Sequence, residues 1–415
     1  MSGVPEIKFL DRIIGPYVDG AELSLYESRY LTKPGDNYGS IMLAINAKIV
    51  RDHGSVEELP LIAKLPPLTN DLYWQLFQPE RTCISENAVY KYLAPELEKL
   101  QLEVGVLPSK LFDGFSRYYG SRISLDEQAT TVDRDAVLVQ ENLTVRGYRP
   151  GNRHKAYDLA HTVLSLHYLA KFHALPIALR LKKPETYNKF VRPYFKKFNM
   201  NASMSAEAKN VMNEENLADI YTITNNNEID VKRVQELQEL FDAYQESADV
   251  DDGPFTTIVH GDLWINNMMV KYDDVGVPTK LKIVDFQIAQ YESLVHDLIF
   301  LFMSSVETSV LEQNYHNFLR IYHNVFIQTL REIAGVIDTN EYSYESFLAE
   351  VQRVAPIQIP HAIFMTKVIK ADNKTIPDDF KDVDFTVLSK NKGVPEVMEK
   401  LSDIIKLAKK FNIFY

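Results

Sequence analysis

Two short polar clusters in the second half of the chain contain residue types that suit phosphoryl transfer. The first has the pattern H-x-D-x4-N, in which His260, Asp262 and Asn267 are the polar positions. In phosphoryl transfer an aspartate beside the attacking hydroxyl orients it and accepts its proton, and an amide five residues later can reach back to a magnesium ion. The second cluster begins with Asp285, at the end of an apolar run, where a carboxylate can hold the metal ions that bridge nucleotide phosphates.

Each of these residues alone has a simpler explanation. An aspartate or asparagine that follows a strand is usually a turn or cap former, because its short side chain bonds to the nearby backbone. The two clusters together are far more specific, because both aspartates lie at predicted strand ends. We therefore expect Asp262, Asn267 and Asp285 to meet at one phosphate-binding site.

Such a site also needs a lysine, a carboxylate that holds the lysine and a loop that covers the phosphates. Lys64 ends an apolar run, and Glu86 lies on the predicted helix that follows, so an ion pair could point the ammonium group toward phosphates. The loop candidate is Gly35-Asp36-Asn37-Tyr38-Gly39-Ser40, whose backbone N–H groups could lie over them. A solvated lysine, an exposed helix glutamate and an ordinary turn are the plainer interpretations. The order of all three ahead of Asp262 favours the functional one.

The hydrophobic pattern predicts a strand-rich beginning and a helical remainder. Short apolar runs broken by Gly, Pro, Asn and Asp fill the first 145 residues, and from Tyr157 onward apolar residues recur at steps of three or four. The predicted strands are Ile41–Val50 and Leu61–Leu65, paired as a hairpin around Asp52, His53 and Gly54, and then Ala136–Leu143, Phe255–Val259 and Leu281–Val284. The predicted helices include Pro79–Leu93, an acidic helix with the apolar stripe Val234, Leu237, Phe241 and Tyr244, and the stretches Ile299–Ile333 and Val397–Phe411.

These elements predict an α+β chain with two lobes. We expect residues 1–143 to form a small β-rich lobe that binds a nucleotide and ends in a hinge. Residues 144–415 would form a larger helical lobe with the catalytic loop and an acceptor pocket. A length of 415 residues supports two such units, because each can bury its own core. The helices after residue 305 are expected to shape the acceptor pocket, although no residue there stands out.

Composition and charge limit the partners that we expect. The net charge of −12 argues against a general nucleic-acid binder, but residues 204–252 contribute −10 of it, so an anionic nucleotide could approach the rest of the molecule. The basic stretch 180–197 is most simply a solvated face. A single cysteine, Cys83, excludes an internal disulfide, and the sequence shows neither a signal peptide nor an apolar run of roughly 20 residues. We expect a cytoplasmic protein with no membrane partner.

The motifs resemble the small-molecule branch of the protein-kinase-like superfamily, which includes the aminoglycoside and choline kinases. They are most similar to the insect ecdysteroid kinase-like family, also called the CHK kinase-like family. The resemblance covers roughly residues 30–305 and is carried by short motifs: GDNYGS, IAKLP at Lys64, ENAVY from Glu86 followed by Pro95, LVQENL, LAKFHAL, HGDLWINN and VDFQ. It implies a two-lobed protein-kinase-like fold, with ATP and Mg²⁺ as cofactors.

The resemblance also implies a role for each candidate residue. Asp262 would be the catalytic base, Asn267 and Asp285 the magnesium ligands, and Lys64 with Glu86 the pair that holds the α and β phosphates. The remaining nucleotide contacts would be the covering loop with Gly35, Asn37, Tyr38, Gly39 and Ser40, and the linker with Gln140, Glu141 and Asn142, which would read the adenine edge. Beyond these, we expect His260 to brace its loop, Trp264 to line either the acceptor pocket or the core, and Asp297 to cap the helix that follows it.

Two departures from protein kinases bear on the substrate. Gln287 occupies the position of the glycine in the D-F-G triplet, and the helix with Asp297 begins within about a dozen residues, which leaves no room for an activation loop. A protein substrate is therefore not expected. The sequence predicts a kinase that phosphorylates an alcohol on a small molecule, and the resemblance suggests an ecdysteroid, another sterol or a xenobiotic, in hormone metabolism or detoxification.

Two alternatives stay open at this point. One is a catalytically silent nucleotide-binding protein on the same fold. The other is a metal-dependent hydrolase that would use His260, Asp262, Asp285, His296 and Asp297. The hydrolase interpretation leaves Lys64, Glu86 and the early glycine loop unexplained. A catalytically silent protein would not need a residue that is competent for catalysis at each of these positions, yet every one of them has such a residue.

Overall fold

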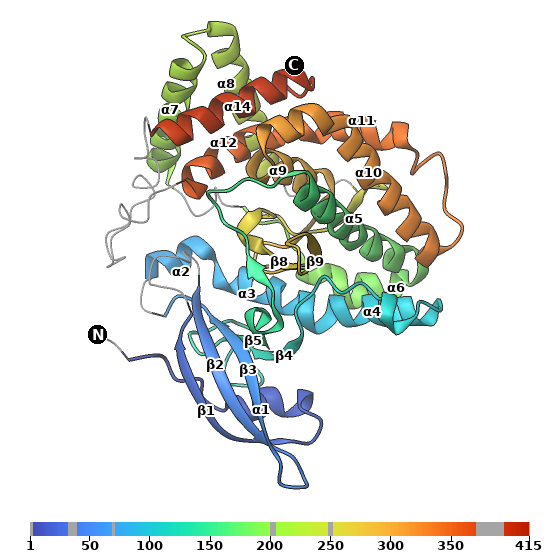
Figure 1. Cartoon of the computed structure of the whole chain (residues 1–415). Coiled ribbons are helices and arrows are strands. Elements are labelled where there is room, and N and C mark those ends of the chain that lie inside the picture. Colours follow the sequence, from blue (N-terminus) through green and yellow to red (C-terminus); the bar gives the residue numbers. More distant parts are fainter. Residues whose placement is uncertain are drawn as a thin grey trace.

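A computed structural model describes residues 3–31, 40–68, 71–199, 205–247, 252–370 and 394–414. Figure 1 shows a β-sheet lobe beneath a larger helical lobe. The sheet of the small lobe has five antiparallel strands in the order β1-β2-β3-β5-β4. Their bounds are β1 Glu22–Tyr30, β2 Ile41–Val50, β3 Val56–Leu65, β4 Tyr118–Arg122 and β5 Val137–Glu141. The two-lobed α+β architecture predicted from the sequence is confirmed.

The predicted hairpin forms between β2 and β3. The strands pair from Ile41 opposite Leu65 to Val50 opposite Val56, so β3 begins five residues before its predicted start. Alternate residues of β2, from Leu43 to Ile49, are buried, as expected for a strand with one face on a core. This register is what brings Lys64 to the end of β3, next to the large lobe.

The predicted helix that begins at Pro79 is longer than expected. It comprises α3 (Pro79–Ala88), a π-helical turn (Val89–Leu93) and α4 (Ala94–Glu103). Pro95 does not interrupt the helical segment, because it lies in the first turn of α4, where its missing N–H is harmless. The short helices α1 (Leu10–Ile14) and α2 (Asp71–Phe77) complete this part of the chain.

Two separate hydrophobic cores explain the two lobes. The smaller one is built from the five-stranded sheet and α1, with Leu43, Leu61 and Val139 among its buried members. The larger one fills the helical lobe and also includes Tyr90 and Leu97 from the π-helical turn and α4. The helix that carries Glu86 is therefore continuous with a segment that packs on the large lobe, whereas Lys64 belongs to the sheet of the small lobe.

The helical lobe surrounds two small antiparallel sheets. Its helices are α5 Leu159–Lys182, α6 Pro184–Thr186, α7 Ala206–Ile223, α8 Glu228–Glu246, α9 Val295–Ser305, α10 Thr308–Ala334, α11 Tyr344–Val354, α12 Gln358–Ile369 and α14 Pro395–Lys410. Its strands are β6 Arg149–Pro150, β7 Thr256–Val259, β8 Met268–Tyr272, β9 Pro278–Ile283 and β10 Gln290–Ser293. The two late strands and the C-terminal helix agree with prediction. The stretch predicted as helical from Ile299 to Ile333 is two helices, separated at Val306 and Glu307.

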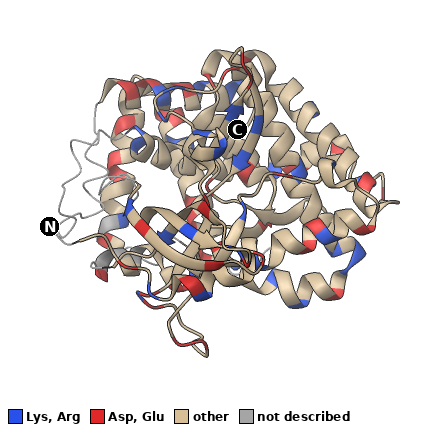
Figure 2. Cartoon of the chain, turned by 60° about the horizontal axis from the view of Figure 1, so that its bottom comes forward, with Lys and Arg blue, Asp and Glu red and all other residues tan. Residues whose placement is uncertain are grey.

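The acidic helix α8 behaves as its pattern predicts, with one exception. Val234, Leu237 and Phe241 are buried, but Asp230 is also buried and forms an ion pair with Lys409 of α14. In Figure 2 acidic and basic positions are interspersed over the face shown. Within the described ranges, none of the helices is long and apolar enough to cross a membrane.

Candidate active site

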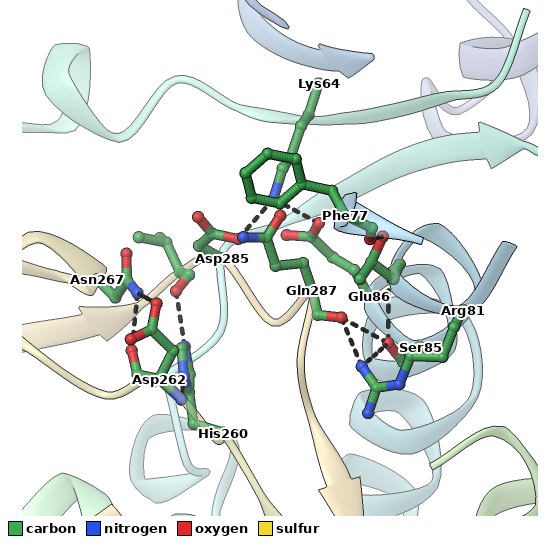
Figure 3. A network of polar contacts seen from close by, with 12 residues as sticks. Lys64, Phe77, Arg81, Ser85, Glu86, His260, Asp262, Asn267, Asp285 and Gln287 are labelled. Atoms are coloured by element: carbon green, nitrogen blue, oxygen red, sulfur yellow. Dashed lines mark hydrogen bonds and ion pairs between the residues drawn. The ribbon is translucent and has the colours of Figure 1, made fainter. Parts of the chain in front are cut away.

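Lys64 at the end of β3 forms two ion pairs. Its Nζ atom lies 2.7 Å from Oε2 of Glu86 on α3 and 2.6 Å from Oδ1 of Asp285, which follows β9 (Figure 3). Burial alone would lower the pKa of Lys64, but the carboxylates of Asp285 and Glu86 outweigh burial and raise it. The ammonium group therefore stays charged inside the protein. Residues from three distant parts of the sequence meet here. The pair of Lys64 with Glu86 was expected, whereas the ion pair with Asp285 was not.

The loop after β7 is fixed by buried hydrogen bonds. His260 donates from Nε2 to the backbone oxygen of Val284 over 2.9 Å, and its Nδ1 accepts from the backbone N–H of Asp262 over 3.2 Å. Both ring nitrogens are occupied, and burial lowers the pKa of this histidine, so the ring is neutral. Gly261 has a φ of 83°, and a Cβ there would lie 2.6 Å from the oxygen of Ile288. His260 thus braces the loop that presents Asp262.

The capping role expected for Asp297 is wrong. This residue lies inside the first turn of α9, and no side chain caps that helix. Its carboxylate instead accepts hydrogen bonds from the backbone N–H groups of His260 at 2.6 Å and Gly261 at 2.8 Å, and it lies 3.0 Å from Nε2 of His173. Burial would raise the pKa of Asp297, but its histidine partners outweigh burial and lower it. The ionised carboxylate holds the loop that carries Asp262.

Asp262 and Asn267 lie side by side beneath Asp285. The Nδ2 atom of Asn267 donates to the backbone oxygen of Asp262 over 2.8 Å and to its Oδ2 over 3.2 Å. Oδ1 of Asp262 is buried and accepts no hydrogen bond from the described residues. Burial and the nearby Asp285 raise the pKa of Asp262 well above its ordinary value. A carboxylate with an unused oxygen and a raised pKa is suited to accept a proton.

The donor atoms around Asp285 suit a magnesium ion. Its backbone is left-handed, with a φ of 66°, which turns the chain sharply after β9 and brings the carboxylate toward Lys64. Within the described part of the chain, Oδ2 of Asp285 and Oδ1 of Asn267 take part in no protein hydrogen bond. Magnesium prefers such hard oxygen donors, and it usually combines one or two protein carboxylates with substrate phosphates. The residue types present therefore fit a nucleotide-bridging metal.

The hydrolase interpretation lacks a ligand set. The described residues contain no group of three or more His, Cys, Asp or Glu side chains that could hold a metal ion. His260 has no free ring nitrogen, and Nδ1 of His296 accepts a hydrogen bond from the side chain of Gln358. Asp297 is engaged by the catalytic loop. The five residues proposed for a hydrolytic centre therefore serve separate purposes.

One cavity of about 660 Å³ joins the two lobes at this point. Its walls include Lys64, Glu86, Asp262, Asn267 and Asp285. The predicted linker residues Gln140, Glu141 and Asn142 also line it, as does Ser40 from the predicted covering loop. Gly35, Asn37, Tyr38 and Gly39 lie outside the described residues, so their covering role stays a prediction. A single space therefore borders the linker, the paired charges and the catalytic loop.

Comparison with protein-family models gives one match that covers more than half of the chain. The matched family is the ecdysteroid kinase-like family, over residues 34–335. The chain belongs to the ecdysteroid kinase-like family. No curated protein matches it.

Three solved structures that are similar to this ecdysteroid kinase-like protein share little sequence with it. A spectinomycin phosphotransferase in complex with ADP and spectinomycin is 11% identical, with a TM-score of 0.43, and the alignment covers 98% of this chain and 97% of that one. An ethanolamine kinase from Plasmodium vivax is 11% identical with a TM-score of 0.35, covering 89% and 82%. A glucosamine kinase in complex with glucosamine, ADP and inorganic phosphate is 12% identical with a TM-score of 0.30, covering 87% and 97%.

The ecdysteroid kinase-like chain replaces an activation loop with a short strand. Gln287 is followed almost at once by β10, which pairs antiparallel with β7, and α9 begins two residues after β10 ends. The segment after Asp285 is therefore locked into the large lobe.

Arg81 is a structural residue of this site that sequence reasoning missed. Its guanidinium group donates to the backbone oxygen of Gln287 at 2.7 Å (Figure 3). It also donates to the backbone oxygens of Ala289 at 2.8 Å and Lys196 at 2.6 Å. Burial lowers its pKa to about 9, which still leaves it charged at neutral pH. Because Arg81 lies on α3 with Glu86, it ties that helix to the segment that follows Asp285. Its position five residues before Glu86 was the available signal, but nothing in the sequence shows which carbonyl groups it would meet.

The rest of the cavity wall, which we call its far end, consists mostly of residues that the sequence did not single out as site residues. They share half-buried or buried positions facing one space and are Phe198, Phe241, Tyr244, Trp264, Gln358, His361, Phe364, Met365 and Val368. Trp264 was predicted to line either the acceptor pocket or the core, and it borders this cavity. In α12 the helical spacing of these residues was the available signal. Positions 361, 364, 365 and 368 share one half-exposed face of the helix, whereas positions 362, 363, 366 and 367 are buried.

Proposed function

We propose that this chain is an ATP- and Mg²⁺-dependent kinase that transfers the γ-phosphoryl group to a hydroxyl of an apolar small molecule, such as an ecdysteroid, another sterol or a xenobiotic alcohol. The observation that carries the proposal is the convergence of Lys64, Glu86, Asp262, Asn267 and Asp285 on one cavity. Membership of the ecdysteroid kinase-like family supports it.

The chain's own residues would divide the work between charge and proton transfer. Lys64, held by Glu86, would neutralise the α and β phosphates once Asp285 turns to its metal. Asn267 and Asp285 would hold Mg²⁺, which when bound neutralises the charge that develops on the phosphoryl oxygens. Asp262 would orient the acceptor hydroxyl and accept its proton on the unused Oδ1. Gln140, Glu141 and Asn142 would contact the adenine, and the lobe boundary would fall at residue 143.

The lining of the far end supports an apolar acceptor. Aromatic and aliphatic side chains dominate there, with Phe198, Phe364, Met365 and Val368 among them. A polycationic acceptor would need carboxylates for its ammonium groups. Glu292, a carboxylate close to this end, is buried and already accepts a hydrogen bond from Tyr244 over 2.8 Å. An uncharged, mostly apolar alcohol is the class that this surface can desolvate at least cost.

Transfer of labelled γ-phosphate to a panel of steroid and xenobiotic alcohols tests the proposal. Asp262→Asn should lower transfer by about 10³-fold, since general-base catalysis contributes about 10²–10⁴-fold, while ATP binding persists. Asp274→Asn, a change on an exposed turn, is the matched control and should leave transfer unchanged.

The same assay separates the alternatives. Thermal stabilisation by ATP without transfer to any alcohol would indicate a silent nucleotide-binding protein. Turnover of a substrate in the absence of ATP would indicate a hydrolase. Either result would overturn the proposed kinase.

A further inference from the structure

Helix α12 presents one polar residue among apolar ones to the far end of the cavity. His361, Phe364, Met365 and Val368 form its half-exposed face, and all four line the cavity. The imidazole of His361 is stacked between Phe300, at 4.5 Å between ring centroids, and Phe241, at 6.2 Å. Aromatic packing thus fixes the plane of the ring, and the contact between Nδ1 and the side chain of Gln358 fixes its rotation within that plane.

A chain of hydrogen bonds determines which nitrogen of His361 carries the proton. Nε2 of His296 faces the carboxylate of Glu292 at 3.7 Å, and a carboxylate can only accept, so the ring proton of His296 belongs on Nε2. Nδ1 of His296 therefore accepts from the amide nitrogen of Gln358, which sets the orientation of that amide. The amide oxygen of Gln358 can only accept, so Nδ1 of His361 donates to it over 3.0 Å. Nε2 of His361 is therefore the unprotonated nitrogen, and no hydrogen bond to it occurs among the described residues.

The charge on this group is also determined. Burial is the largest of the effects that lower the pKa of His361, to about 4, so the ring is neutral over the physiological range and Nε2 keeps its lone pair. A neutral acceptor inside an apolar wall costs little when the cavity holds water, but it favours a ligand that brings a donor to the same place. A hydroxyl group is the donor that an uncharged ligand most simply offers.

We propose that His361 is a specificity residue whose Nε2 accepts a hydrogen bond from a second hydroxyl of the acceptor, so that the site prefers apolar diols and polyols to mono-alcohols. This inference rests on the proposed function for the identity of the cavity's occupant. According to this inference, α12 recognises one end of the acceptor, and the hydroxyl that is phosphorylated lies at the other end.

Equilibrium binding tests the inference without any need for catalysis. The probes are the steroid mono-alcohol androstanol and its diol androstanediol, which differ by one hydroxyl at the far end of a rigid ring system. Trp264 lines the cavity, so quenching of tryptophan fluorescence reports their binding. The unmodified chain should bind the diol about 10-fold more tightly, which is the effect of one hydrogen bond to a neutral group.

Three variants make the result specific to one nitrogen atom. His361→Phe keeps the aromatic stack and removes the lone pair, so it should bind the two probes within about 2-fold of each other and keep its affinity for the mono-alcohol. His361→Gln restores an acceptor and should recover part of the preference. His316→Phe, an exposed histidine of α10, is the control and should keep the full preference.

Two results would overturn the inference: equal binding of both probes by the unmodified chain, or a full preference for the diol in His361→Phe. Because binding is measured without nucleotide, failure of phosphoryl transfer in the kinase assay leaves this test intact. A preference for the diol with no transfer would reject the kinase and retain the contact at His361.

Discussion

The two ends of the cavity are built in different ways. At the end that we assign to the nucleotide, and call the nucleotide end, Lys64, Asp262 and Asp285 lie at strand ends or in a loop held by Asp297, and their contacts are short and charged. At the acceptor end, α8 and α12 present the sides of helices, and the lining is mostly aromatic and aliphatic. A charged constellation needs fixed geometry, because misplacement of a charge by about 1 Å can lower the rate about 10²-fold. An apolar wall needs only a shape that is complementary to the acceptor. Substitutions there can therefore change which acceptor binds without disturbing the residues that carry out phosphoryl transfer.

Asp285→Asn should produce the largest difference between the two ends. The change removes the carboxylate that we assign to the metal and leaves Lys64 with one ion pair, so transfer should fall by about 10³-fold. Acceptor binding, which depends on the other end, should change by less than about 2-fold. Initial rates over a range of Mg²⁺ concentrations and fluorescence titration with a steroid alcohol measure the two effects. Loss of both in parallel would show that the ends are not independent.

Arg81→Met tests whether phosphoryl transfer depends on the backbone position of the segment after Asp285, as well as on the charged side chains of the nucleotide end. Without the guanidinium group, the backbone oxygens of Gln287 and Ala289 lose their donor, and the segment after Asp285 can shift. We expect kcat to fall by about 10–100-fold and half-saturation to need more Mg²⁺. Adding guanidinium ions to Arg81→Ala should restore part of the rate.

Arg122→Met is the matched control for Arg81. Arg122 also donates to a backbone oxygen, that of Asp135 at 2.8 Å, but it lies on β4 away from the cavity lining. It should lower the melting temperature without changing the dependence on Mg²⁺. If both arginines changed the Mg²⁺ dependence equally, Arg81 would be a general stabilising residue and not a positioning one.

Phe364→Ala addresses the acceptor end alone. The substitution removes an apolar side chain from the cavity wall, and a lost contact of about 1–2 kcal/mol raises the KM for the acceptor by about 5–30-fold. The KM for ATP should stay within about 2-fold of its original value. Leu240→Ala, on the exposed side of α8, is the control and should change neither constant. A rise in the KM for ATP would contradict the separation of the two ends.

The same contrast explains what the sequence could predict. Asp262, Asn267 and Asp285 follow predicted strands, and Lys64 ends a strand of the hairpin, so local pattern marked them as candidates. Their order along the chain and the family resemblance, and not local pattern, supplied the expectation that they meet. Hydrophobic periodicity predicted both lobes, because burial on one side of a strand or helix repeats at a fixed step.

What the sequence could not predict depends on tertiary contacts. Arg81 meets backbone oxygens, which every residue has, so no residue type marks its partners. The acidic residue Asp297 resembles a helix cap in sequence, but the fold turns its carboxylate toward Gly261 and His173. The lining of α12 resembles any amphipathic helix until the cavity beside it is known.

The smallest effect that we predict is the change in melting temperature caused by Asp262→Asn in the free protein. The informative part is whether this change is positive or negative. Burial and Asp285 raise the pKa of Asp262 in the folded state above the unfolded value of about 3.9. Between these two values the folded protein holds a proton that the unfolded chain has lost, so stability falls as pH rises through this window. Above the raised pKa, the folded protein carries the full cost of an ionised and buried carboxylate.

The neutral asparagine avoids that cost at every pH. Without nucleotide or Mg²⁺, Asp262→Asn should therefore melt about 2–4 °C higher than the unmodified chain at pH 7.5, and the difference should disappear at about pH 3, where Asp262 is protonated in both the folded and the unfolded chain. Calorimetry at the two pH values measures it. A variant that is less stable at pH 7.5 would mean that the carboxylate of Asp262 has partners that offset the cost of its burial. The nucleotide end would then not lower the stability of the free protein, as a buried and unpaired catalytic base should.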